Sequence, residues 1–231
     1  TVHGVQKLGL DPPRPSGYYH PGAPIGQALA SAQARPALEV AVIGLGAGTL
    51  AAYSRPNDTY TFYEIDPAVV ELATNPDFFT YISEAEGSID FVLGDGRIMV
   101  DRGSATYDMI VMDAFGSDAI PTHLVTREAI VVYLDHLGPD GVLMVHISNR
   151  HIDLEPVLGR LAAEAGLVAR SRHHIPAGAA IEEGAVSTTW VAMARSDEAL
   201  AGFASEWPTP PADGPLWTDS YTSLLSVFRW G

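Results

Sequence analysis

Residues 40–48 read VAVIGLGAG, and Glu64 follows twenty residues after Gly44 within the stretch TYTFYEID. An apolar strand that runs into Gly44-x-Gly46-x-Gly48 predicts a tight turn open to a nucleotide, because glycines accept backbone angles and close approaches that a Cβ forbids. An acid at the end of the next strand can accept hydrogen bonds from ribose hydroxyls. A GxGxG string alone is often only a helix-packing turn. Together with its strand and Glu64, it predicts a nucleoside-cofactor site.

Strand-like and helix-like stretches alternate from Glu39 onward. The predicted strands are residues 39–43, 60–64, 88–93, 107–112, 141–147, 167–173 and 187–194, with helices near 48–54, 67–73, 126–137 and 153–165. Strands joined by crossover helices predict a mainly parallel sheet covered on both faces. The last two strands have no strong helical pattern between them, so we expect an antiparallel hairpin. The predicted fold class is α/β, a Rossmann-like seven-stranded methyltransferase-type sheet, rather than an all-parallel dehydrogenase sheet.

The amino-terminal segment differs from the rest of the chain. Residues 11–26 are rich in Pro and Gly, and a short helix is predicted at 25–34. The first eight residues, TVHGVQKL, read as one strand of a hairpin whose partner is missing. We therefore expect a short, truncated amino-terminal strand and loop segment over residues 1–38, a Rossmann-like nucleoside-binding transferase domain over 39–231, and an origin as part of a longer chain.

The composition is that of an acidic globular protein. The chain has 231 residues, a formal net charge of −15 and 47% hydrophobic residues, which is enough for a full core and excludes disorder. An acidic surface repels nucleic-acid phosphates and favours cationic ligands; solubility or adaptation to salt explains the charge equally simply. The absence of cysteine rules out disulfides and thiolate metal sites. No apolar run approaches the ~20 residues of a membrane span.

The residues just past the predicted strand ends include more acids and another glycine turn. Gly94-Asp95-Gly96 follows the third strand and Asp113 follows the fourth. Ligand sites in open α/β sheets lie outside the carboxyl ends of the strands, so these residues and Glu64 predict one shared site. Each acid has a simpler explanation as well, Asp95 as a turn residue and Asp113 as a helix cap. Asp66, before a proline, is expected to cap the next helix.

These residues resemble the spermidine synthase (polyamine aminopropyltransferase) family. The most specific motifs are VIGLGAGT at 42–49, FYEIDP at 62–67, GDGR at 94–97, DAFGSDAIPTHL at 113–124 and HISNRHIDLEP at 146–156. More narrowly, the chain is similar to spermidine-synthase-like proteins that often occur fused to a membrane-spanning region. The resemblance runs from residue 3 to residue 225. It implies a methyltransferase-like Rossmann sheet behind a small amino-terminal strand region, in a homodimer.

The resemblance also implies roles for individual residues. Glu64 matches the ribose-binding acid, Asp95 the acid that reads the adenine amino group, and Asp113 the catalytic aspartate that receives the acceptor amine. The implied cofactor-binding set is Gly44, Gly46, Gly48, Glu64, Asp95 and Gly96. The implied substrate-binding set is Tyr19, His20, Asp118 and Tyr221. Of the latter, Tyr19 and His20 match a pair that touches donor and acceptor, and Tyr221 lies in a segment that helps to close the active-site entrance.

Two departures from the family pattern concern the recognition of charged amines. The family's glycine loop carries an aspartate that holds the ammonium of the aminopropyl donor, and this chain has Ala47 there. The family's D-x-x-D-P motif is also changed, since the second acid, Asp118, lies further along the chain. Asp118 is equally well explained as a loop acid. The donor class is therefore better determined than the donor itself.

The leading functional interpretation is a transferase that alkylates an amine from a sulfonium nucleoside, most simply polyamine aminopropyl transfer. The donor would be decarboxylated S-adenosylmethionine or S-adenosylmethionine, and the partner a small cationic amine in the cytoplasm. We also expect a possible membrane region before Thr1, no nucleic-acid partner and no bound metal. The alternatives are an S-adenosylmethionine-dependent methyltransferase and a non-catalytic nucleoside-sensing domain of a membrane protein. His146 and His151 suggest metal only weakly, because their spacing matches no helical metal motif.

Overall fold

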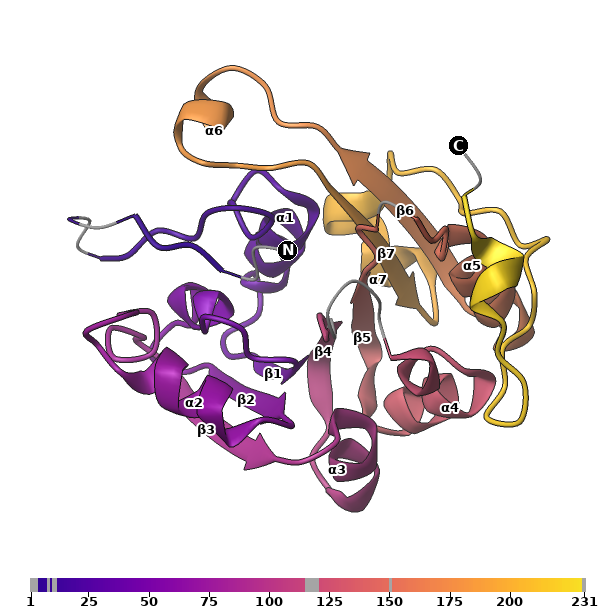
Figure 1. The fold of residues 1–231 in the computed structure, drawn as a ribbon, viewed down its shortest axis with the longest axis horizontal. Coiled ribbons are helices and arrows are strands. Elements are labelled where there is room, and N and C mark those ends of the chain that lie inside the picture. The colour runs from indigo at the N-terminus through magenta and orange to yellow at the C-terminus, as the bar shows by residue number, and fades with distance from the viewer. Residues whose placement is uncertain (1–3, 8, 10–11, 115–120, 150, 230–231) are drawn as a thin grey trace.

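The computed structural model describes residues 4–7, 9, 12–114, 121–149 and 151–229 of the chain (Figure 1). Its centre is a seven-stranded sheet in the order β3-β2-β1-β4-β5-β7-β6. The strands are β1 Glu39–Ile43, β2 Thr59–Glu64, β3 Ser88–Leu93, β4 Tyr107–Met112, β5 Leu137–His146, β6 Val168–His174 and β7 Thr188–Ala194. The first five are parallel, and β7 pairs antiparallel with both β5 and β6. The predicted seven-stranded sheet and its terminal hairpin are confirmed.

Helices cover both faces of this sheet. They are α1 Pro24–Ala32, α2 Pro67–Thr74, α3 Gly96–Arg102, α4 Arg127–Asp135, α5 Glu155–Glu164, α6 Ala179–Glu182 and α7 Asp197–Ala204. Short 3₁₀ turns lie at η1 Thr49–Tyr53, η2 Thr122–Leu124 and η3 Leu224–Val227. Successive strand side chains point to opposite faces, so each strand contributes to two hydrophobic cores. One core joins the sheet to α1, α2 and α7, and the other joins it to α3, α4 and α5.

Three helices were not expected from the sequence. The α3 helix follows directly from the GDG turn, and Asp95 caps it by accepting a hydrogen bond from the Ile98 N–H at 3.0 Å. The α7 helix has a glycine in its second turn, which weakens the helical pattern. The four-residue α6 lies at the tip of the connection between β6 and β7, and Figure 1 shows this connection arching beside α1.

The amino-terminal segment packs against loops between the strands without forming a strand of its own among the described residues. The Gln6 side chain exchanges hydrogen bonds with Thr80, and the Tyr81 hydroxyl donates to the Val5 carbonyl at 3.0 Å. Further along, Gly17 forms an isolated bridge with Ala185. The strand predicted over residues 1–8 lies partly outside the described residues, and its described part, residues 4–7, forms no strand. None of the helices in the described ranges has the length and apolar character needed to cross a membrane.

Candidate active site

A cavity of about 580 Å³ opens at the carboxyl ends of β1, β2, β3 and β4. Its size is within the usual range for small-molecule sites. Predicted site residues make up much of its lining: Tyr19, Gly44, Gly46, Glu64, Asp95, Gly96 and Asp113. The parallel strands bring together residues that are far apart in sequence. The cavity therefore lies where the glycine loop and the strand-end acids predict a site.

Gly44 sets the geometry between the glycine loop and β4. It has a φ of 98°, and a Cβ at this position would lie 2.5 Å from the carbonyl oxygen of Asp113. Only glycine combines this backbone angle with such a close approach. On the other side of the loop, a Cβ at Gly4 would lie 2.4 Å from the Ala47 Cβ. The loop is thus closely packed between the end of β4 and the amino-terminal segment.

Glu64 ends β2 with its carboxylate turned toward this loop. One oxygen accepts a hydrogen bond from the Leu45 N–H at 3.0 Å, and the other accepts from the Ile65 and Asp66 N–H groups at 2.8 and 3.0 Å. These bonds fix the carboxylate in place while it lines the cavity. The oxygen facing Leu45 can still accept a further hydrogen bond, as a ribose hydroxyl would require. Asp66 caps α2, as expected.

Asp95 has two partners at the start of α3. One oxygen caps the helix, and the other lies 2.7 Å from His123 Nε2. His123, in η2, also lines the cavity. A single histidine in a loop gives no spacing signal, so sequence reasoning did not identify it, although it lies within the DAFGSDAIPTHL motif. Asp95 is therefore a helix cap that also presents a carboxylate to the cavity.

Asp113 follows β4 and is the most enclosed acid of the site, with a side chain only 1% exposed. The Tyr19 hydroxyl donates to its Oδ2, and His146 Nδ1 lies 2.7 Å from its Oδ1. Burial, and then the charge of Asp113, raise the pKa of Tyr19 well above its ordinary value. Tyr19 therefore remains a hydrogen-bond donor to the carboxylate at all physiological pH values.

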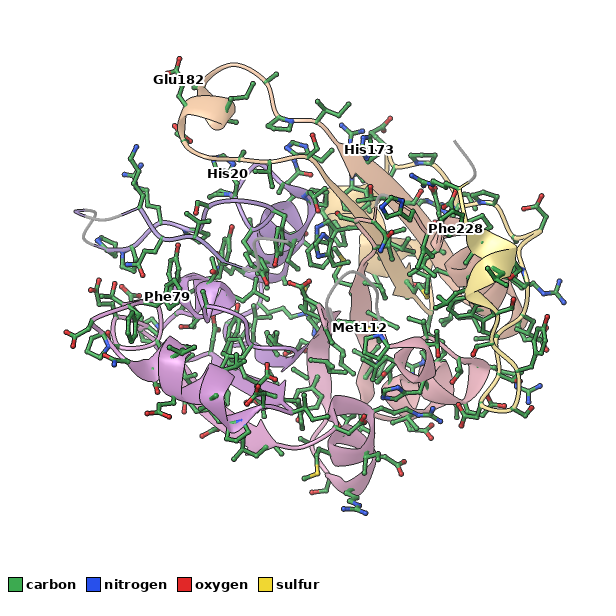
Figure 2. The ribbon with its side chains drawn as sticks, viewed as in Figure 1. His20, Phe79, Met112, His173, Glu182 and Phe228 are labelled. Atoms are coloured by element: carbon green, nitrogen blue, oxygen red, sulfur yellow. The ribbon has the colours of Figure 1, made fainter. Side chains whose placement is uncertain are left out.

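Three of the described site residues that the sequence predicts are not part of the cavity lining. His20 accepts a hydrogen bond from the Gly22 N–H and contacts Glu183, and Figure 2 shows it away from Met112 at the end of β4. Gly48 is the residue before η1, where a Cβ would meet the Ile82 side chain. Tyr221 is 59% exposed on the tail and pairs with Thr218. Asp118 lies outside the described residues.

The carboxy-terminal tail is fastened close to the cavity. Arg97 of the GDGR motif donates to both carboxylate oxygens of Asp219 at 2.7 Å, and it also donates to the His123 carbonyl at 2.9 Å. The Thr126 hydroxyl donates to the same aspartate. The Arg97 hydrogen bonds are the main cause that lowers the pKa of Asp219 to about 2. The Thr218–Tyr221 turn is thereby linked to both Asp95 and His123 through α3 and η2.

The charged groups of the cavity are almost all acidic. Glu64, Asp66, Asp95 and Asp113 contribute carboxylates, and His123 is the single basic side chain among the described lining residues. Neither lysine nor arginine is found in that described lining. Within the described ranges, no group of three or more His, Asp or Glu residues is arranged to hold a metal ion. The lining therefore favours a cationic ligand.

The sheet order and a nucleoside-sized cavity at the carboxyl ends of its strands define a methyltransferase-type Rossmann protein. The chain is similar to the spermidine synthase family, as its motifs indicate. It is 30% identical over 151 residues to a probable polyamine aminopropyl transferase of Bifidobacterium longum, an alignment that covers 64% of this chain and 32% of that protein. The chain spans about a third of the length of the curated relatives it matches. No protein-family model matches it.

Solved structures support the same fold. A probable spermidine synthase from Corynebacterium glutamicum superposes with a TM-score of 0.59 at 18% identity, covering 87% of this chain and 80% of that one. The human methyltransferase-like protein 13, solved in complex with SAH, gives a TM-score of 0.54 at 19% identity and covers 87% of this chain and 97% of that one. The predicted methyltransferase-type Rossmann fold is thus confirmed.

Proposed function

We propose that the chain is a polyamine aminopropyltransferase of the spermidine synthase type. It would transfer the aminopropyl group of decarboxylated S-adenosylmethionine to a small cationic amine, with Asp113 receiving the amine. The observation that carries this proposal is the position of Asp113, whose side chain is almost fully buried and which lines the same cavity as Glu64 and Asp95. The similarity to relatives named as aminopropyl transferases supports the same reaction.

The charge of the cavity favours the decarboxylated donor. S-adenosylmethionine carries a carboxylate, and the described lining offers no lysine or arginine to bind one. The decarboxylated donor has only cationic groups, a sulfonium and an ammonium, which suit an acid-rich lining. Ala47 does not supply the loop aspartate of the family, so the ammonium would depend on the strand-end acids instead. Ribose would be bound by Glu64 and adenine by Asp95.

The chemistry needs little from the protein beyond orientation and a free amine. A new carbon–nitrogen bond forms as the carbon–sulfur bond breaks, and the sulfur leaves as a neutral thioether. An alkyl amine, with a pKa of roughly 10, arrives protonated at neutral pH. Asp113 would attract this cation and accept its proton, directly or through water, as the nitrogen attacks. This step requires an ionised Asp113 carboxylate. The hydrogen-bond partners on both of its oxygens are consistent with that form.

A methyltransferase is the second candidate, and Ala47 is the residue that favours it. A glycine loop of the form GLGAG is close to a common methyltransferase loop. Intact S-adenosylmethionine carries a carboxylate, so a loop without an acid would favour its binding. The two candidates release different products. Aminopropyl transfer releases methylthioadenosine, whereas methyl transfer releases S-adenosylhomocysteine.

The test is to incubate the protein with each donor and a panel of mono-, di- and triamines, and to follow both products by mass spectrometry. We expect methylthioadenosine that appears only when an amine is present. The Asp113→Asn variant should lower kcat/KM at least about 100-fold, the usual size of a lost general base. Asp90→Asn removes the same charge from an exposed position on β3 and should leave the rate unchanged. Formation of S-adenosylhomocysteine would overturn the proposal, and donor binding without turnover would favour a sensor.

The proposal also includes a homodimer acting in the cytoplasm, as in the family that the chain resembles. Sedimentation velocity on the purified protein tests the assembly. A single species with the mass of one 24.6 kDa chain at all concentrations would contradict it.

A further inference from the structure

His146 is a buried histidine that the proposed reaction has so far left without a role. It ends β5, and its side chain is 4% exposed. Its ring lies between two aromatic rings, 4.5 Å from the Tyr18 centroid at an interplanar angle of 29° and 4.6 Å from the Trp190 centroid at 17°. Both faces of the imidazole are thus covered by aromatic rings, and its nitrogens form hydrogen bonds in the plane of the ring.

The partners of the two nitrogens favour the tautomer that is protonated at Nδ1. Nδ1 lies 2.7 Å from Asp113 Oδ1, and a carboxylate only accepts hydrogen bonds, so Nδ1 carries a proton. Nε2 lies 2.7 Å from the Ser148 hydroxyl and 3.0 Å from the Thr188 hydroxyl. Both hydroxyls can donate to a bare nitrogen. The Ser148 oxygen accepts the Thr189 N–H at 2.9 Å and lies 3.1 Å from the Thr188 hydroxyl, so one of the two hydroxyls can donate to Nε2 while the other donates to its neighbour.

A neutral imidazole preserves the charge that the proposed reaction needs. With His146 neutral and Asp113 ionised, the pair carries one negative charge, which can attract an ammonium and take its proton. An imidazolium would cancel that charge. Among the residues that the structure describes, Tyr18 and Tyr19 are titratable groups that contact this pair, and burial raises the pKa of both hydroxyls above their ordinary value. Both therefore remain neutral beside the carboxylate.

We propose that His146 is a positioning residue that acts through Asp113. Its Nδ1–H holds one carboxylate oxygen while Tyr19 holds the other, so the plane of the carboxylate is fixed toward the cavity. Ser148 and Thr188 keep the imidazole in the tautomer that can donate. This inference rests on the proposed function, because Asp113 is the group that receives the acceptor amine there. Sequence reasoning found only a weak metal signal at His146, because its partners come from the end of β4, from β7 and from the amino-terminal segment.

Two substitutions of His146 separate the N–H donor from simple space filling. His146→Leu removes the donor but retains bulk between the two aromatic rings, whereas His146→Asn is smaller but places an amide N–H near the position of Nδ1. We expect the leucine variant to lower kcat about 100-fold, as a misplaced reacting group does, with the KM of the donor changed less than about twofold. We expect the asparagine variant to recover at least about tenfold of that loss. If the residue only fills space, asparagine will be no better than leucine, which would overturn the inference.

A second measurement does not depend on turnover. Long-range ¹H–¹⁵N NMR correlations of the histidine rings report which nitrogen is protonated, and the His146 signals are assigned by their loss in His146→Asn. We expect a protonated Nδ1 and a bare Nε2 in the wild-type protein, and a mixture of tautomers in Ser148→Ala/Thr188→Val. That double variant also serves if the leucine variant fails to fold, and its kcat should fall while donor binding persists. A wild-type His146 protonated on Nε2 alone would overturn the inference.

The outcomes distinguish this inference from the function on which it rests. Wild-type turnover with equal rates for the asparagine and leucine variants overturns the role of His146 and leaves the proposed function intact. A wild-type protein that binds the donor and transfers nothing to any amine overturns both.

Discussion

Gly44 shows how one residue couples the glycine loop to the catalytic strand. Its positive φ is a conformational requirement, and its approach to the Asp113 carbonyl is a separate steric one. Gly166, just past α5, has a similar positive φ of 67° but no atom within 4 Å of where its Cβ would lie. The two glycines therefore allow the two requirements to be measured separately.

We expect Gly166→Ala to lower the free energy of unfolding by about 1 kcal/mol, the cost of a left-handed alanine. Gly44→Ala should lower it by about 3 kcal/mol, because the added Cβ must also displace β4 or the loop. It should weaken donor binding as well, since the loop lines the cavity. Urea denaturation and calorimetric titration with the donor measure both effects. Equal losses of stability in the two variants would show that the steric contact is unimportant.

The sequence predicted those site residues whose positions depend only on sheet topology. Glu64, Asp95 and Asp113 follow strands of one parallel sheet, and the carboxyl ends of such strands meet at one edge. Tyr18 and His146 could not be predicted in the same way, because their stacking depends on how the amino-terminal segment crosses β5 and β7. For His20, the motif does not show that the Gly22 turn directs the ring toward Glu183.

At the scale of elements, the tail is an example of a segment that one ion pair connects to the site. Trp217 anchors it, since its side chain is fully buried in the core beside α4 and its carbonyl accepts the Arg127 N–H at 2.9 Å. Arg97 and Thr126 then fix Asp219 at the next turn. The tail is thus held by the burial of Trp217 and by the ion pair between Asp219 and Arg97.

The charged part of this attachment should weaken in acid. The pKa of Asp219 is lowered from 3.8 to about 2, with the Arg97 hydrogen bonds as the main cause. A lowered pKa contributes stability that is complete above the unfolded value and is lost as the pH falls toward the folded value. Between pH 5 and pH 2, we expect the free energy of unfolding to fall by at most about 1 kcal/mol more in the wild-type protein than in Asp219→Asn. The difference is small because the aspartate is half exposed. Thermal unfolding across this range measures it.

Asp213→Asn is the matched control for this prediction, since it removes an exposed carboxylate from the same tail. Its stability curve should run parallel to that of the wild-type protein. Parallel curves for Asp219→Asn and wild type would mean that Arg97 and Asp219 contribute nothing to stability.

Strands were predicted to within a few residues, whereas several helices were not predicted. Buried parallel strands are continuous apolar runs that stand out in a sequence. In contrast, α3, α6 and α7 are four to eight residues long, and helices of that length depend on tertiary packing more than on their own pattern. The start of α3 inside the GDG motif was hidden for a further reason, since its first residues were interpreted as a turn.

For the whole molecule, the charge should govern how a substrate arrives. A net charge of −15 over 231 residues surrounds an acid-lined cavity with a negative potential. Such a field raises the local concentration of cations and is screened by salt within about 10 Å at 0.1 M. The effect should therefore depend on the charge of the ligand.

We expect the KM of a cationic diamine to rise several-fold between about 0.05 M and 0.5 M salt, because the Debye length shrinks over that range. The dissociation constant of methylthioadenosine, which is neutral, should change little, and it serves as the internal control. Steady-state kinetics and calorimetry at matched temperature give the two values. An equal change for both ligands would indicate a general effect of salt on the fold instead of steering by charge.

The contact between Gly4 and Ala47 has a consequence for how this chain could have diverged. Each residue occupies the space that a larger neighbour would need, since a Cβ at position 4 would lie 2.4 Å from that of Ala47. A side chain at position 4 would therefore have to displace the glycine loop unless position 47 lost its own Cβ. We expect the two positions to form an epistatic pair, in which a residue larger than glycine at position 4 is tolerated only after Ala47 becomes glycine.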